Sequence, residues 1–106
     1  MGLSKNKIKY LNSLALKKNR DKEGVFIAEG VKLVGDLLPY FDAKLIVAED
    51  SWIEEKNPKA EEIILVDSLD EMKKISQLST PSSVYAVFYR PKYNLNLQEF
   101  VKKQDL

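Results

Sequence analysis

The chain has 106 residues, of which 44% are apolar and 31% are charged, and its net charge is +1. This length suits one domain with a modest core, and this composition is typical of a folded protein and not of a disordered one. Cysteine and histidine are both absent, which excludes Ser-His-Asp and Cys-His catalysis and metal sites built from thiolate or imidazole groups. No apolar run approaches the roughly 20 residues of a membrane-spanning helix, and no signal peptide is recognisable.

The positive charges gather at the N-terminal end of the chain. Residues 1–22 hold seven lysines and arginines against one acidic residue, a net charge of +6, which leaves −5 for residues 23–106. A segment with this charge suits the phosphate backbone of a nucleic acid. The alternative is that these residues form only the solvated face of a helix.

The first predicted element is a helix. Ser4 can cap a helix over residues 5–16, where apolar side chains recur on one side and lysines on the other. Because lysines interrupt the apolar side further along, we expect the helix to end near residues 17–19. Residues 17–22 would then form a basic loop.

Strands and helices alternate after this loop. Residues 25–28 are a short apolar run, which predicts a central strand buried on both faces. Three further strands are predicted over residues 44–48, 63–66 and 84–89. The helices that connect the four strands are predicted over residues 31–38, 51–57 and 69–75. This alternation predicts a three-layer α/β/α sandwich with a mostly parallel four-stranded sheet over residues 1–91. Residues 92–106 are polar and predict a linker or a marginal terminal helix.

Three predicted strands end in acidic residues, namely Glu29, Glu49 and Asp67. The carboxyl ends of strands line the usual site of an open α/β sheet, so one interpretation is a magnesium site or a small enzyme that uses carboxylates. The other is that these acids precede helices and complement their dipoles. For Glu29, which Gly30 follows, an ion pair with Arg20 and hydrogen bonds from backbone amides are both open.

Aromatic side chains are of interest because RNA bases stack on them. Tyr10, Tyr89 and Tyr93 are the candidates for the surface, since a tyrosine hydroxyl needs water or a partner. The alternative for each is a half-buried position at a sheet edge. Core or packing positions are expected for Phe26, Phe41, Trp52, Phe88 and Phe100.

Two stretches resemble the N-terminal region of the SpoU/TrmH-type RNA 2′-O-ribose methyltransferases of the SPOUT superfamily. The first, SKNKIKYLNSLALKKNRDKEGVFIAEGVKLVGDLL, has a helix, a basic stretch and a strand of pattern Phe-x-x-Glu-Gly, here Phe26, Glu29 and Gly30. The second, LSTPSSVYAVFYRP, is similar to the family's loop containing Thr and Pro, followed by Ala-Val. This chain has Ser82-Ser83 where many members have Gln-Gly.

The resemblance implies an N-terminal substrate-binding domain, similar to small ribosomal proteins that bind kinked RNA. It implies that S-adenosylmethionine binds to a separate C-terminal knotted domain, which also forms the homodimer, so this chain alone is not expected to be catalytic or to need a cofactor. Residues 92–106 would be the linker toward that domain. The expected partner is RNA, ribosomal RNA in preference to transfer RNA, in the cytoplasm and away from membranes. The resemblance and the charge pattern together assign RNA contacts to Lys5, Lys9, Lys17, Lys18, Arg20, Lys22, Lys32, Thr80 and Ser82.

Other functions remain open for a chain of this kind. It could be a stand-alone module that binds structured RNA, because such a module would share the same fold. It could instead be a protein-interaction domain, which the acidic charge of residues 23–106 favours.

Overall fold

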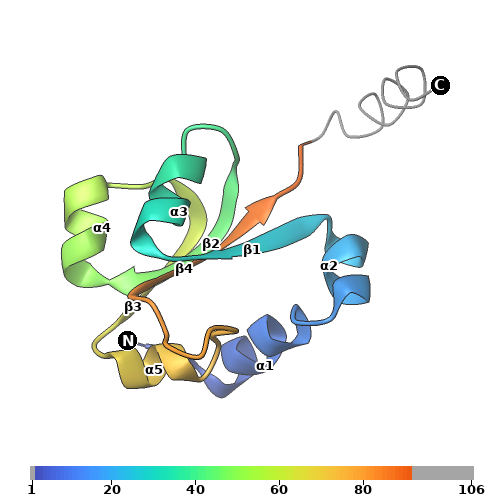
Figure 1. Ribbon diagram of the computed structural model, residues 1–106, viewed down its shortest axis with the longest axis horizontal. Helices are drawn as coiled ribbons and strands as arrows, with labels where there is room; N and C mark the ends of the chain where they lie inside the picture. Colours follow the sequence, from blue (N-terminus) through green and yellow to red (C-terminus); the bar gives the residue numbers. More distant parts are fainter. Residues whose placement is uncertain (1, 92–106) are drawn as a thin grey trace.

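The computed structural model describes residues 2–91, in which five helices and four strands alternate (Figure 1). The helices are α1 (Lys5–Ser13), α2 (Lys17–Glu23), α3 (Val31–Leu37), α4 (Asp50–Lys56) and α5 (Leu69–Lys73). The strands are β1 (Val25–Glu29), β2 (Ala43–Glu49), β3 (Ala60–Val66) and β4 (Val84–Tyr89). None of the helices within residues 2–91 has the length and apolar character to cross a membrane. The predicted linker over residues 92–106, with Tyr93 and Phe100, lies outside the described residues.

The sheet is mixed, so the prediction of a mostly parallel sheet is wrong. The strand order is β1-β4-β2-β3, with β2 and β3 parallel and β4 antiparallel to both of its neighbours. A parallel β4 would require the chain to return along the whole of β3, about 23 Å for seven residues. Helix α5 has five residues and spans only about 8 Å. The ten residues 74–83 could cover the rest in extended form, at about 3.3 Å each, but Ser76 and Gln77 are bound to Glu29 at the end of β1. The connection therefore stays at the end of the sheet where β1 and β3 finish, and β4 runs back from there.

Strand β1 lies at an edge of this sheet, which corrects the prediction of a central strand. Only Val25 and Ala28 of its five residues are buried, whereas β2 and β4 in the centre are buried along most of their length. A continuous apolar run of four or five residues is too short to distinguish a central strand from an edge strand. In this fold the α2 and α3 helices at its two ends supply part of the cover that a second neighbouring strand would give.

Helices cover both faces of the sheet, and the apolar side chains divide into two clusters accordingly. One cluster lies beneath α1 and α5, and the other beneath α3 and α4 (Figure 1). The first contains Leu11, Leu14, Val25, Leu45, Val47, Val66, Met72, Ile75, Tyr85 and Val87. The second contains Ala28, Val34, Ala43, Ile46, Ala48, Trp52, Val84, Ala86 and Phe88. The alternation along β2 and β4 assigns successive residues to opposite clusters, as the pleat of a strand requires.

Three phenylalanines join the sheet to the turn that follows α3. The ring of Phe26 lies 5.1 Å from that of Phe41 in an edge-to-face arrangement and 5.5 Å from that of Phe88 in a stacked one, measured between centroids. Such pairs add about 0.5–1.5 kcal/mol to the burial of their surface. Their predicted role as core or packing residues is confirmed, and so is that of Trp52, which is 7% exposed.

Candidate nucleic-acid interface

The N-terminal basic segment is helical, so the prediction of a basic loop over residues 17–22 is wrong. Helix α1 begins after Ser4, whose Oγ accepts a hydrogen bond from the Lys7 amide at 3.1 Å, as predicted, but it ends at Ser13. The chain turns through residues 14–16 and starts again as α2. Gly24 ends α2 with a φ of 69°, a left-handed conformation that glycine adopts at little cost.

Arg20 fastens α2 to α1. Its Nη1 donates hydrogen bonds to the carbonyl oxygens of Leu14 at 2.8 Å and Ala15 at 2.9 Å. These carbonyls follow the end of α1, where backbone acceptors lack partners within the helix. The proposed ion pair between Arg20 and Glu29 is therefore not formed, and the guanidinium group is used to join two helices.

The acidic residues of α2 hold it against the rest of the domain. Asp21 lies 2.7 Å from Nη2 of Arg90 and 2.8 Å from Nζ of Lys17. The hydrogen bond from Lys17, followed by that from Arg90, lowers the pKa of Asp21. Asp21 thus joins α2 to the residue that follows β4.

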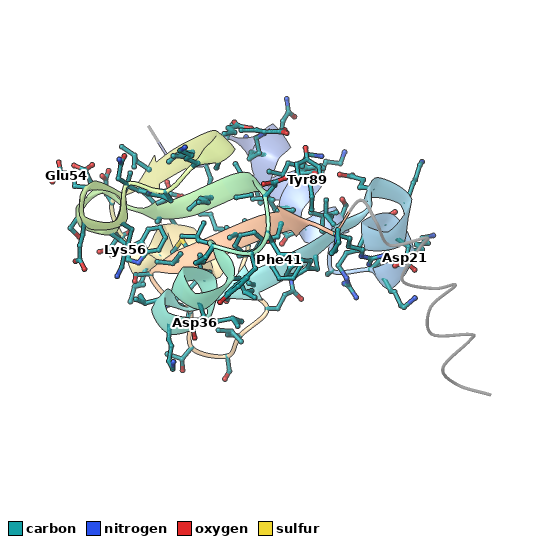
Figure 2. The ribbon with its side chains drawn as sticks, turned by 90° about the horizontal axis from the view of Figure 1, so that it is seen from above. Asp21, Asp36, Phe41, Glu54, Lys56 and Tyr89 are labelled. Atoms are coloured by element: carbon teal, nitrogen blue, oxygen red, sulfur yellow. The ribbon has the colours of Figure 1, made fainter. Side chains whose placement is uncertain are left out.

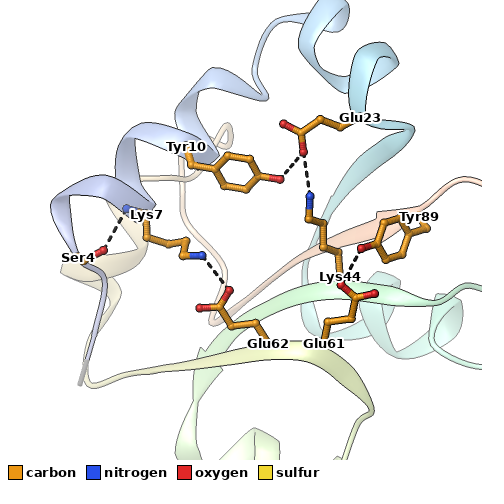
Figure 3. A network of polar contacts seen from close by, with 8 residues as sticks. All are labelled: Ser4, Lys7, Tyr10, Glu23, Lys44, Glu61, Glu62 and Tyr89. Atoms are coloured by element: carbon orange, nitrogen blue, oxygen red, sulfur yellow. Dashed lines mark hydrogen bonds and ion pairs between the residues drawn. The ribbon is translucent and has the colours of Figure 1, made fainter.

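Glu23 is the centre of a polar contact between α1, α2 and β2 (Figure 3). Its Oε1 accepts hydrogen bonds from the Tyr10 hydroxyl at 2.5 Å and from Nζ of Lys44 at 3.0 Å. Lys44 occupies a bulge, because the pairing of β2 with β4 shifts between Ala43 and Leu45. An extra residue in a strand re-aims its side chain, here toward α1 and α2. The hydrogen bond from Tyr10 lowers the pKa of Glu23.

Replacing Tyr10 by phenylalanine tests this contact. We expect the free energy of unfolding at neutral pH to fall by about 1 kcal/mol, because Glu23 loses one hydrogen bond in a half-buried position. A depressed carboxyl pKa stabilises the folded state above the ordinary value of 4.5, and this stabilisation is lost as the pH falls through the folded-state pKa. The difference between wild type and Tyr10→Phe should therefore shrink in acid, as measured by urea unfolding at several pH values. A difference that is the same at every pH would contradict the assignment.

Two lysines of α2 have no such partners among the described residues. Lys17, Lys18 and Lys22 are all exposed, and within residues 2–91 neither Lys18 nor Lys22 has an acidic side chain at ion-pair distance. The two acids of the helix are engaged, Asp21 by Lys17 and Arg90 and Glu23 by Tyr10 and Lys44, and this leaves the charges of Lys18 and Lys22 unbalanced. Helix α2 consequently presents positive charge on a rigid base, as phosphate recognition requires.

The Glu29-Gly30 pair holds the loop before β4. Oε1 of Glu29 accepts a hydrogen bond from Oγ of Ser76 at 2.6 Å, and its Oε2 accepts one from the Gln77 amide at 2.8 Å. The Gly30 amide donates to the Val84 carbonyl at 3.0 Å. Of the two roles open for Glu29, acceptance of a backbone amide is thus confirmed. The φ of Gly30 is 119°, which side-chain-bearing residues rarely adopt.

The predicted RNA-contacting residues lie in three places. Lys17, Lys18, Arg20 and Lys22 lie on α2, beside the start of β1, and Lys5 and Lys9 are exposed on α1. The remaining three, Lys32, Thr80 and Ser82, follow the far end of β1, about 17 Å away along its five residues. Lys32 pairs with Asp36 at 3.2 Å, and Oγ of Ser82 accepts from the Val84 amide at 3.3 Å. The nine residues predicted to contact RNA therefore do not form a single surface patch.

The acidic residues at the strand ends do not converge. Within residues 2–91 no three acidic side chains lie together as metal ligands would. Glu29 is used to hold the loop, and α4 and α5 begin immediately after Glu49 and Ser68. For these acids the structure supports the interpretation as residues that precede helices.

The tyrosines expected at the surface are half-buried, and a different tyrosine is exposed. Tyr10 and Tyr89 are half-buried, and the hydroxyl of Tyr89 donates to Oε1 of Glu61 at 2.7 Å (Figure 3). The alternative of a half-buried position therefore holds for both. Tyr40, which the sequence analysis did not single out, is 80% exposed. Its position directly after Pro39, in a turn that ends a helix, is the signal that could have drawn attention to it.

Comparison with known proteins places these features in a family. Residues 5–86 match the family described as the MRM3-like substrate binding domain. The chain belongs to this family. The resemblance to SpoU/TrmH RNA methyltransferases is thereby confirmed, and Phe26, Glu29 and Gly30 lie within the matched residues of the MRM3-like domain.

Solved structures agree with this assignment of the MRM3-like domain. A TrmH-family RNA methyltransferase from Porphyromonas gingivalis is 34% identical, with a TM-score of 0.79 over 87% of this chain and 37% of that protein. An rRNA methyltransferase from Sinorhizobium meliloti, 24% identical, superposes with a TM-score of 0.67 over 85% of this chain and 36% of that one. The SpoU methyltransferase AviRb from Streptomyces viridochromogenes, solved with AdoMet, is 15% identical, with a TM-score of 0.60 over 84% of this chain and 37% of that protein. The last two show the shared fold. The chain spans somewhat over a third of each protein's length, and a comparison with curated proteins gave no match.

Proposed function

We propose that this MRM3-like domain binds RNA through the outward lysines of α2 and holds a ribose in place for 2′-O-methylation. The observation that carries the proposal is a division among the charges of α2. Asp21 and Glu23 already have partners in the protein, whereas Lys18 and Lys22 are exposed and have no acidic partner within residues 2–91. A helix with this division offers ammonium groups whose partners are not already supplied by the protein. Each phosphate contact releases condensed counterions, which is favourable and depends on salt.

The methyl transfer itself is assigned to another part of the protein. AviRb, which shares this fold, was solved with AdoMet and is nearly three times as long as the stretch that this chain matches. We infer that S-adenosylmethionine binds to a separate catalytic domain, that this domain forms the homodimer, and that residues 92–106 lead toward it. Residues 1–91 would then be the RNA-binding domain of a cytoplasmic protein, with the fold of ribosomal proteins that bind kinked RNA.

Ribosomal RNA is the proposed substrate class, with transfer RNA as the second. The support is the S. meliloti relative, which is an rRNA methyltransferase of the same fold. Specificity would arise from RNA shape and unpaired bases, because phosphate contacts position a nucleic acid without reading its sequence. Lys5 and Lys9 on α1 and Lys32, Thr80 and Ser82 near the far end of β1 would add contacts as a structured RNA crosses the domain.

The double variant Lys18→Gln and Lys22→Gln tests the role of α2. We expect weaker binding to ribosomal and transfer RNA, and a log–log salt slope that is shallower by about 2, because two phosphate contacts are lost. Filter-binding titrations between low and moderate salt give both quantities. The double variant Lys73→Gln and Lys74→Gln on α5 is the matched control, since it removes the same charge from lysines that lie 3.7 and 3.4 Å from acids.

Two outcomes would contradict the proposal. If the α5 control weakened binding as much as the α2 variant, net charge and not α2 would govern the affinity. If the wild-type chain bound neither RNA at low salt, the interpretation as a protein-interaction domain would replace it.

A further inference from the structure

The start of β1 and the end of β4 lie beside an open groove that the proposed function does not use. Its walls are the turn after α3 over residues 38–43, the turn between α4 and β3 over residues 56–61, and residues 89–91. Its volume is about 1170 Å³, which is large enough for a nucleotide-sized ligand. Figure 2 shows Phe41, Lys56 and Tyr89 from three different elements around this region.

Tyr40 supplies an exposed aromatic ring at this groove. It is 80% exposed, although its neighbour Phe41 packs against Phe26 and Phe88. The amides of Tyr40 and Phe41 both donate to the Leu37 carbonyl, at 2.9 and 3.0 Å. The turn is therefore fixed from inside by Phe41, and it holds the ring of Tyr40 in the open, where a base can stack on its face.

The walls of the groove are stiff. Three of the chain's four prolines line it, namely Pro39, Pro58 and Pro91, and each fixes its own φ angle. Asn57 precedes Pro58 in a left-handed conformation with φ of 44°. A groove whose turns are already set loses little conformational entropy when a ligand enters it.

Positive charge borders the same groove. Lys56 and Lys59 are exposed lining residues, and within residues 2–91 Lys59 has no acidic side chain at ion-pair distance. Of the two acids in the lining, Glu61 already accepts the Tyr89 hydroxyl, and Asp42 is the other. Arg90 also lines the groove, and its contact with Asp21 at 2.7 Å joins the groove to α2.

We propose that this groove holds an unpaired nucleotide of the RNA, with its base stacked on Tyr40 and its phosphate beside Lys59. The proposal rests on the proposed function and extends it from phosphate contacts at α2 to an adjoining site for a single-stranded segment. The base must be unpaired, because both faces of a base within a duplex are already stacked. RNA fits better than an apolar protein segment, since Lys56 and Lys59 line the same groove as the ring, and Arg90 joins the groove to α2.

The test uses the full 106-residue chain with two probes, a labelled single-stranded RNA of mixed sequence and a fully paired RNA duplex of the same length. Tyr40→Ala should weaken binding of the single strand roughly 5- to 150-fold, the range for loss of one stacking partner. It should leave duplex binding nearly unchanged. Tyr40→Phe should bind both probes like the wild type, because it keeps the ring. Lys59→Gln should make the single-strand salt slope shallower by about 0.7, the value for one phosphate contact.

Leu69→Ala is the matched control, because Leu69 is also an exposed apolar side chain, 45% exposed, but begins α5. Equal binding of the single strand by wild type and Tyr40→Ala would overturn the site and leave the RNA-binding function intact. Equal losses for single strand and duplex would also overturn it, because stacking would not be the cause. If a second copy of the chain filled the groove, Tyr40→Ala would alter sedimentation of the RNA-free protein without changing RNA affinity, again overturning the site. Failure of the wild type to bind either probe would instead contradict the proposed function.

Discussion

Glu29→Ala is expected to lower the free energy of unfolding by about 2–4 kcal/mol. The carboxylate accepts hydrogen bonds from the Ser76 hydroxyl and the Gln77 amide, and hydrogen bonds to charged groups contribute about 1.5–3 kcal/mol each when well buried. The expected loss is smaller than the sum of the two hydrogen-bond contributions, because Glu29 is only half-buried. Urea unfolding followed by the fluorescence of Trp52, the single tryptophan, measures the loss.

Two variants separate the causes of this loss. Glu29→Gln retains an acceptor for the Gln77 amide and should lose less stability, and Ser76→Ala removes one of the two hydrogen bonds and should cost about 1 kcal/mol. Hydrogen exchange of the Gln77 amide gives a local measurement, and we expect faster exchange in Glu29→Ala. An unchanged exchange rate would show that Glu29 does not hold the loop before β4.

Arg20→Ala is expected to cost about 1–3 kcal/mol of stability. The variant loses the hydrogen bonds to the carbonyls of Leu14 and Ala15, and one of these, to Leu14, is half-buried. Arg20→Lys should recover only part, because an ammonium group lacks the planar geometry of the guanidinium group. Thermal or urea unfolding measures this. Lys18→Ala on the same helix is the control and should change stability by less than about 0.5 kcal/mol, since Lys18 is exposed.

The same variant distinguishes a structural arginine from one that contacts RNA. If Arg20 joins the two helices, Arg20→Ala loses stability while its log–log salt slope for RNA binding stays near that of the wild type. If stability were unchanged and the slope became shallower by about 1, Arg20 would be a phosphate ligand and the structural assignment would be wrong.

Much of the fold could be predicted from local patterns. Strand β4 was predicted with its observed limits, and the cap of α1 by Ser4 was also predicted. These features depend on neighbouring residues, namely a capping hydroxyl, a β-branched and aromatic run, and a terminating proline. The Phe-x-x-Glu-Gly motif is also local, and it carried the resemblance to the SpoU/TrmH-type methyltransferases. Its glycine has a φ of 119°, which other residues avoid.

Partners far apart in the sequence could not be predicted in this way. The helical state of residues 17–23 depends on Arg20, Asp21 and Glu23, whose partners include Leu14, Arg90 and Tyr10. By its own composition the segment is a cluster of charges, for which a loop was a reasonable prediction. Its acids gain their distant partners only in the folded domain, where Arg90, directly after β4, lies beside Asp21 and Lys44 of β2 lies beside Glu23.

The sequence by itself indicated an α/β domain with a basic N-terminal segment, and two of its stretches resemble the SpoU/TrmH-type RNA methyltransferases. Composition, charge and helical and strand periodicity are local properties, and they are enough for the α/β class and the basic segment. Only the tertiary structure decided that β4 runs antiparallel between β1 and β2, that Glu29 holds a loop 47 residues away, and that Tyr40 borders a groove. Each of these depends on which distant segments come together, and that is set by long-range contacts such as those of Glu29 with Ser76 and Gln77 and by the packing of both faces of the sheet, which no local pattern encodes.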